Sequence, residues 1–233
     1  MLTDVQLQQI MPRLAAAKLQ LYLPHLNQAL THYGVDTMRR TAAFIAQLAH
    51  ESGEFRWMQE IWGPTDAQRR YEPPGTLAAR LGNTQPGDGK RFKGRGPIQI
   101  TGRFNYAKYG TLLGVDLVAQ PELAATPEYA FATAGLYWQS NGLNELADAE
   151  DFIKITRRIN GGTNGLADRQ KYHALALGVL ATGFVAGPVL RGAARRKASG
   201  ATEPLLRGQE SIRRIRTGAA AAAKKPSAKA LKR

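Results

Sequence analysis

The pair His50-Glu51 lies near the end of a predicted helix and is the first candidate for chemistry in this 233-residue chain. Residues 38–52 place apolar side chains at helical spacing, so that Glu51 would lie where the helix meets the interior. Burial at such a place raises the pKa of a carboxyl group, as a general acid requires near neutral pH. A helix-end glutamate that only caps the helix or pairs with a cation is the structural alternative.

A second carboxylate, Glu60, follows nine residues later and could complete an acid–base pair. An inverting glycosidase holds two carboxylates about 6.5–9.5 Å apart, with a water between the base and the sugar. Nine residues of continuous helix would turn the second group by roughly 180° and move it about 13.5 Å along the axis. The helix must therefore break between them, and Ser52-Gly53 is the predicted break. From spacing alone, Glu54 and Glu72 remain rival partners.

A glycine-rich stretch at residues 93–106, KGRGPIQITGRFNY, offers a set of neutral polar side chains. It lacks the Gly-Lys-Ser/Thr ending of a phosphate-binding loop, so that interpretation fails. In an extended segment Gln99 and Thr101 would point to the same side, and Asn105 follows at the start of a predicted helix. Such amides and hydroxyls bind sugar hydroxyl and acetamido groups or orient a water, although a structural turn could use the same residues.

A third set of candidates comes later in the chain, where Ile159-Asn160-Gly161-Gly162 is followed by Asp168-Arg169. A tight Gly-Gly turn beside an asparagine either brings backbone groups to a ligand or simply ends a helix. The residues alone leave both interpretations open.

These candidates require a mainly helical frame. Thr3 and Asp4 are predicted to cap a first helix, and further helices are expected at residues 19–33, 38–52, 103–113, 127–140, 152–159 and 167–180. Residues 62–97 contain seven glycines and five prolines, which predicts an irregular, loop-rich insertion with room for short strands. The expected fold is therefore mainly α, interrupted in the middle.

Charge and composition divide the chain at about residue 183. Residues 1–183 carry 19 Lys/Arg and 16 Asp/Glu, whereas residues 184–233 carry 13 Lys/Arg and two Glu, a net charge of +11. We therefore expect a folded domain over residues 1–183 and a disordered, Ala/Lys/Arg-rich tail over residues 184–233. A cationic tail of this kind favours a polyanionic partner.

Cysteine is absent, which excludes disulfides, thiolate metal sites and a cysteine nucleophile. Residues 174–190 lack charge, but they include glycine and proline, so we interpret them as a buried final helix and a linker rather than a membrane segment. The N-terminus has no basic region followed by an apolar run, so no signal peptide is expected.

Several of these motifs, in this order and spacing, resemble glycoside hydrolase family 19, which includes chitinases and a bacteriophage endolysin branch. The motifs are HESGEF (50–55), Glu60, GRGPIQITGRFNY (94–106), GVDL with PEL (114–123), INGG (159–162) and ADR (167–169). The resemblance extends from about residue 2 to residue 180. It implies a two-lobed, lysozyme-like helical fold and an inverting mechanism without cofactor or metal.

The resemblance also implies a role for each matching residue. Glu51 would be the general acid, Glu60 the general base and Thr101 the residue that helps to hold the water. The remaining implied residues would contact the substrate or line its site: Gln99, Asn105, Tyr106, Asn160 and Arg169. Phe104 departs from the chitinase pattern, which often has tyrosine there, and this weakens the case for chitin specificity.

The missing cysteines, the short form and the absence of a chitin-binding module favour bacterial peptidoglycan as the substrate, cut between N-acetylmuramic acid and N-acetylglucosamine. A chitinase acting on β-1,4-linked N-acetylglucosamine is the alternative. The protein is expected to be monomeric and made in the cytoplasm, and to reach the periplasm and cell wall through a holin or a secretion system. The basic tail would contact the anionic outer envelope; nucleic acid is not expected as a partner.

Overall fold

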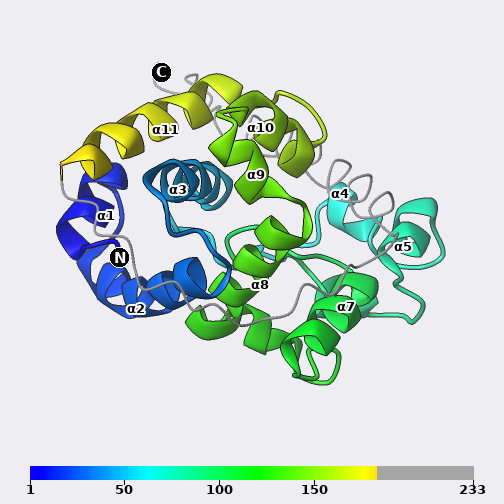
Figure 1. Ribbon diagram of the computed structural model, residues 1–233. Coiled ribbons are helices and arrows are strands. Elements are labelled where there is room, and N and C mark those ends of the chain that lie inside the picture. The colour runs from blue at the N-terminus through cyan, green and yellow to red at the C-terminus, as the bar shows by residue number, and fades with distance from the viewer. Residues whose placement is uncertain (183–233) are drawn as a thin grey trace, which may run out of the picture.

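Helix α3 (Met38–Ser52) runs through the centre of the larger part of the molecule (Figure 1). In this computed structural model, which describes residues 1–182, its N-terminus is capped by the Thr37 hydroxyl, which accepts a hydrogen bond from the Arg40 amide. The helix ends at Gly53, whose φ of 60° lies in the left-handed region that glycine adopts without strain. The helix therefore breaks at the predicted place.

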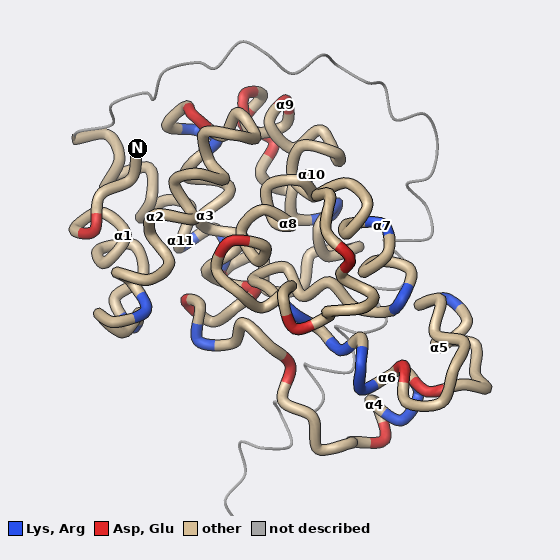
Figure 2. Tube along the Cα trace, turned by 90° about the horizontal axis from the view of Figure 1, so that it is seen from below, with Lys and Arg blue, Asp and Glu red and all other residues tan. Residues whose placement is uncertain are grey.

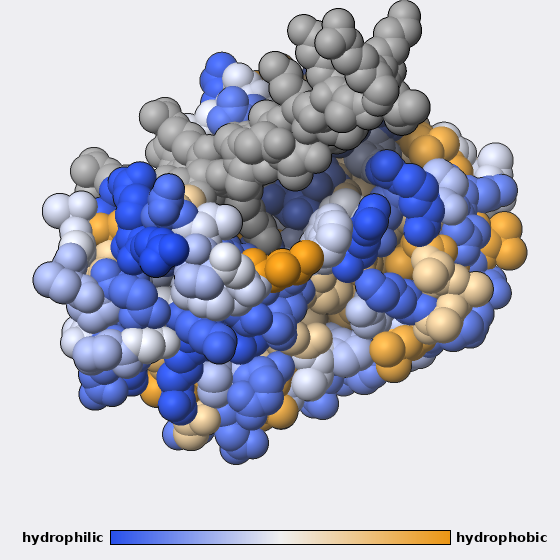
Figure 3. Space-filling view, turned by 180° about the vertical axis from the view of Figure 1, so that it is seen from behind, coloured by the Kyte–Doolittle hydropathy of each residue, from blue (hydrophilic) through white to orange (hydrophobic). Residues whose placement is uncertain are grey.

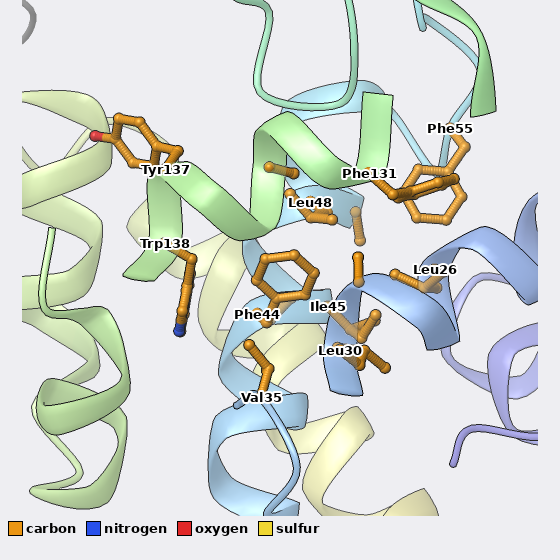
Figure 4. Packing of buried hydrophobic residues seen from close by; sticks show 14 of the residues in the cluster. Leu26, Leu30, Val35, Phe44, Ile45, Leu48, Phe55, Phe131, Tyr137 and Trp138 are labelled. Atoms are coloured by element: carbon orange, nitrogen blue, oxygen red, sulfur yellow. The ribbon is translucent and has the colours of Figure 1, made fainter. Parts of the chain in front are cut away.

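Six helices surround α3 and form with it a large lobe. Helix α11 lies along α3, and α2 packs against α8. Figure 4 shows Phe44, Ile45 and Leu48 of α3 meeting side chains of α2 and α8 in the core of this lobe. The surrounding helices are α1 (Asp4–Ile10), α2 (Ala16–His32), α8 (Pro127–Ser140), α9 (Leu143–Asp148), α10 (Phe152–Asn160) and α11 (Leu166–Ala181).

A small lobe, defined here as residues 60–113, extends to the other side of α8 (Figure 1). Three short helices and one longer helix build it: α4 (Asp66–Arg69), α5 (Thr76–Leu81), α6 (Asp88–Arg91) and α7 (Arg103–Leu113). Tyr71, Leu77 and Leu81 form its own small core, covered by Trp62. A 3-10 turn, η1 (Pro121–Ala125), leads from this lobe back to α8.

The prediction of a mainly helical fold with a loop-rich insertion is confirmed, and the predicted bounds of α3, α7 and α8 agree with the structure. The short strands that the sequence allowed in this insertion do not form. Among residues 1–182 the only β pairings are isolated bridges from Arg95 to Gln59 and to Ile100. The insertion forms short helices instead, and the first of them, α4, is capped by Thr65. Short helices α9 and η1 were also not predicted.

None of the helices in the described part of the chain is long and apolar enough to cross a membrane. Helix α11 ends at Ala181, close to the predicted end at residue 180. The second half of the uncharged stretch and the predicted tail at residues 184–233 lie outside the described residues.

Candidate active site

Glu51 lies in the last turn of α3 and is held by an ion pair. Its Oε1 is 2.7 Å from Nη2 of Arg169 on α11, and the two side chains are only 8% and 1% exposed. Nη1 of Arg169 donates a hydrogen bond to Gln47 Oε1, one turn earlier on α3, and Gln47 Nε2 donates to Thr156 Oγ1 at 2.9 Å. Three helices thus fix the orientation of one carboxylate.

The charge on Arg169 persists at neutral pH despite its burial. Burial lowers the pKa of Arg169 to about 10, while the negative charge of Asp168 acts in the opposite direction. Asp168 in turn lies 2.6 Å from Nδ1 of His50, the neighbour of Glu51. Contacts at residues 50 and 51 therefore both attach the end of α3 to the start of α11.

Asn160 belongs to the same group. Its Nδ2 donates to the Asn164 carbonyl at 3.3 Å, and Nε of Arg169 donates to that carbonyl at 3.4 Å. The turn at residues 161–165 therefore brings the last residue of α10 next to the partner of Glu51. Asn160 is 2% exposed.

The turn that follows α3 is an unusual run of left-handed backbone. The φ values of Gly53, Glu54 and Phe55 are 60°, 59° and 59°. Residues other than glycine adopt such positive φ values only at a cost in free energy. Glu54 Oε1 accepts hydrogen bonds from Arg13 Nε at 2.8 Å and from the Tyr172 hydroxyl at 2.6 Å, and Oε2 accepts from the Arg13 amide at 2.6 Å.

Glu54 is therefore not the second member of a catalytic pair. Its side chain is 2% exposed and both of its oxygens are engaged. Two further hydrogen bonds, from Lys18 Nζ to the carbonyls of Phe55 and Arg56 at 3.3 and 3.2 Å, also hold this turn. These contacts set the path of the chain between Glu51 and Glu60.

Glu60 is held mainly by a loop. Its amide donates to the Gly94 carbonyl at 2.8 Å, and the Gly94 amide donates back to Glu60 Oε2 at 3.0 Å. Gln68 Nε2 and the Tyr71 hydroxyl approach Oε1 at 3.2 and 3.4 Å. Because a carboxylate offers about four lone-pair sites, these three donors leave one for a further donor such as water.

Glu72, the other rival partner, has a structural role. Its carboxylate accepts hydrogen bonds from the backbone amides of Gly87 at 2.9 Å and Lys90 at 3.2 Å, around the start of α6. Of the three carboxylates considered beside Glu51, Glu60 is thus the one that the glycine-rich stretch contacts.

Gln99 and Thr101 converge on Gly94, although not for the predicted reason. The segment is a tight turn rather than a strand: Gln99 has a φ of 56°, and its amide donates to the Gly96 carbonyl at 3.1 Å. A Cβ added at Gly94 would lie 2.6 Å from Gln99 Oε1 and 3.3 Å from Thr101 Oγ1. Both side chains therefore lie beside the glycine that binds Glu60.

Asn105 brings an unused acceptor to this loop. Its Nδ2 donates to the Thr101 carbonyl at 2.7 Å, whereas its buried Oδ1 has no hydrogen-bond partner among residues 1–182. A buried acceptor without a partner is costly, so this position favours a donor from a ligand.

The structure corrects the prediction for Tyr106, which is fully buried rather than placed to contact a substrate. Its hydroxyl donates to the Lys93 carbonyl and accepts from Arg95 Nη1, both at 2.7 Å. Burial is also the main cause that raises the pKa of Tyr106 above its ordinary value. Tyr106 therefore supports the Gly94 loop from inside.

Two residues at the carboxylates were not predicted: Gln47, which binds the partner of Glu51, and Gln68, which binds Glu60. The sequence does indicate Gln47, because it is the one amide in the apolar run 42–49 and lies one helical turn before Glu51. No sequence pattern indicates Gln68, because its contact with Glu60 depends on how the loop after residue 60 folds back.

Comparisons with known proteins show the family to which the chain belongs. The family model described as chitinase class I matches residues 28–170, a range that includes all the predicted site residues. A glycosyl hydrolase family 19 domain-containing protein of Haemophilus influenzae is 34% identical over 200 residues, which are 75% of this chain and 96% of that protein. An endochitinase of Arabidopsis thaliana is 38% identical over 61% of this chain, but the match spans only 47% of the plant protein.

Solved structures show the same fold. Chitinase C from Streptomyces griseus superposes with a TM-score of 0.62 at 24% identity, covering 77% of this chain and 92% of that one. A class IV family 19 chitinase from Zea mays gives a TM-score of 0.57 at 24% identity, covering 81% and 96%. The fold and the sequence matches define a chitinase-type glycosidase with a lysozyme-like helical fold. The chain belongs to glycoside hydrolase family 19.

Proposed function

We propose that this glycosidase cleaves the glycan strands of bacterial peptidoglycan, at the bond between N-acetylmuramic acid and N-acetylglucosamine, as a phage-type endolysin. The observation that carries the catalytic part of the proposal is the separate fixing of two carboxylates. Glu51 is held by Arg169 in the large lobe, and Glu60 is held by the Gly94 loop of the small lobe.

In the proposed reaction Glu51 donates a proton to the glycosidic oxygen. Glu60 accepts a proton from the water that attacks the sugar from the opposite face, so that the configuration inverts. The remaining lone-pair site on Glu60 is the place for that water, and Thr101 lies beside the same loop to help hold it. Gln99, Asn105 and Asn160 supply polar contacts for the sugars.

Charge supports peptidoglycan as the substrate. The chain has a formal net charge of +14, and peptidoglycan carries carboxylates, whereas chitin is neutral. The printed names of the relatives, endochitinases and chitinases, support hydrolysis of chitin as the second candidate function.

The same proposal includes a place of action. The enzyme would act in the periplasm and cell wall after release by a holin or a secretion system. The basic residues 184–233, which lie outside the described part, would add contact with the anionic envelope.

Digestion of purified peptidoglycan, followed by mass and NMR analysis of the products, tests the proposal. We expect reducing ends with inverted anomeric configuration and an activity loss of about 10²- to 10⁴-fold in Glu51→Gln. Lysis of permeabilised Gram-negative cells should fall in parallel, with circular dichroism unchanged. Anhydro-sugar products would instead indicate a lytic transglycosylase, and cleavage of chitin oligomers alone would indicate a chitinase.

A further inference from the structure

The two lobes carry opposite net charge. Within the small lobe, residues 60–113, there are nine Lys/Arg and four Asp/Glu, a net charge of +5. The other residues of the described part, 1–59 and 114–182, carry ten Lys/Arg and twelve Asp/Glu, a net charge of −2. Figure 2 shows blue positions following one another along α4 to α7, while several red positions gather near α9. The positive charge is therefore concentrated in the lobe that holds Glu60.

Most acidic groups of the small lobe are already engaged within it. Glu72 binds backbone amides at α6, and Asp88 lies 2.6 Å from Nη2 of Arg103.

Hydrophilic side chains cover most of the face of the molecule seen in Figure 3, with hydrophobic ones scattered among them. Such a surface favours recognition of a ligand through charge and hydrogen bonds rather than through a broad apolar patch.

Two cations flank the glycine that binds Glu60. Arg95 is 7% exposed, donates to the Arg91 carbonyl and the Tyr106 hydroxyl, and pairs with no carboxylate among residues 1–182. Its buried Nε also has no acceptor there. A buried guanidinium without an anionic partner leaves a positive field in its surroundings, because little solvent screens it.

Lys93 is the accessible cation of this pair. Its side chain is half-buried, and its carbonyl is fixed by the Tyr106 hydroxyl at 2.7 Å. Burial, and then the charges of Arg95 and Lys90, lower the pKa of the Lys93 ammonium, while the charge of Glu60 acts in the opposite direction. Lys93 is thus a partly exposed cation directly before the glycine that binds Glu60, in a lobe where positive charge is in excess.

We propose that Lys93 binds a carboxylate of the substrate, and that the site therefore prefers an anionic amino-sugar polymer to neutral chitin. This inference rests on the proposed function, which it deepens by naming the group that is recognised. Two carboxylates of peptidoglycan share the required chemistry. One is the lactyl carboxylate of N-acetylmuramic acid, which is free only where no peptide is joined to it by an amide bond, and the other is on the acidic residues of the attached peptide.

The test compares kcat/KM of the wild type and Lys93→Met on matched substrates. Carboxymethyl chitin and glycol chitin are anionic and neutral forms of one backbone. Peptidoglycan strands with and without their peptides, the latter prepared with an amidase, distinguish the two sources of carboxylate. We expect Lys93→Met to reduce the anionic-to-neutral ratio of kcat/KM about fivefold, mainly through KM, as for a partly exposed ion pair. Lys93→Arg should restore most of the ratio, and added salt should lower it in the wild type but much less in Lys93→Met.

Lys108→Met is the matched control, because Lys108 is a half-buried lysine of the same lobe whose pKa is lowered by burial alone. It should leave the ratio unchanged. An unchanged ratio in Lys93→Met, or an equal change in Lys108→Met, would overturn the inference. Failure of the wild type to cut peptidoglycan overturns the proposed function instead, because the two chitin derivatives still report on Lys93.

Discussion

The two carboxylates of the site are fixed by different kinds of structure. Glu51 lies on a long central helix and is bound by the side chain of Arg169 from another helix. Glu60 lies in an irregular segment, where its amide donates to the Gly94 carbonyl and its Oε2 accepts from the Gly94 amide. The difference separates two ways of placing a carboxylate: one depends on helix packing and an ion pair, and the other depends on the absence of a side chain at one residue.

The strongest test of the comparison is removal of the charge on Glu60. If Glu60 is the proposed base, Glu60→Gln should lower kcat about 10²- to 10⁴-fold, because a neutral amide cannot accept the proton of the attacking water. Steady-state kinetics with thermal unfolding measures both effects. Glu72→Gln is the control in the same lobe: it weakens bonds to two backbone amides and should cost about 1 kcal/mol of stability while kcat stays unchanged. A highly active Glu60→Gln would show that the loop does not hold the base.

The position of Glu51 at the end of α3 depends on its ion pair with Arg169. Arg169→Met should lower the free energy of unfolding by about 3 kcal/mol, because it removes the positive charge of Arg169 from the buried carboxylate of Glu51. Denaturant unfolding measures the loss, with the exposed Arg157→Met as the control. Adding Glu51→Gln to Arg169→Met should recover part of the stability. If the double variant were no more stable than the single one, the ion pair would not be the cause.

The position of Glu60 depends on its hydrogen bonds with Gly94. Gly94→Ala would place a methyl group 2.6 Å from Gln99 Oε1 and 3.3 Å from Thr101 Oγ1, so the Gln99 side chain must move. We expect kcat to fall about 10- to 100-fold, since a misplacement of about 1 Å in a proposed substrate-binding group beside Glu60 can cost that much. Gly63→Ala in the same lobe meets no atom within 4 Å and should have little effect on kcat. Equal activity of the two variants would contradict the role given to Gly94.

The smallest expected effect concerns the acid stability of the small lobe. Burial raises the pKa of Asp88, but hydrogen bonds from Arg103 and from the amides of Gln85 and Thr84 outweigh it, so the pKa lies below its ordinary value. Asp88 therefore stabilises the fold fully above its unfolded pKa of about 3.9, and the contribution is lost as pH falls through the lower folded value. Unfolding between pH 6 and pH 2 should show that Asp88→Asn loses this pH-dependent part. The exposed Asp66→Asn should retain it.

The same contrast explains what could be predicted from sequence. The apolar spacing of residues 38–52 and the following Gly53 determine α3 and its end locally, so Glu51 could be placed correctly. The contact of Glu60 with Gly94 joins residues 34 positions apart through a tight turn, and no local pattern encodes it. Tyr106 shows the same limit, because its position in the helix gives no sign that its hydroxyl faces inward to Lys93 and Arg95.

The cluster of Arg13, Glu54 and Tyr172 bears on how the chain can be shortened. Glu54 lies within residues 28–170, which the family model matches, but both of its partners lie outside that range. A fragment cut to residues 28–170 would keep the motifs and lose Arg13, Tyr172 and also Lys18, which all bind the left-handed turn between Glu51 and Glu60. The shortest piece that keeps these contacts must therefore include residues 13–172.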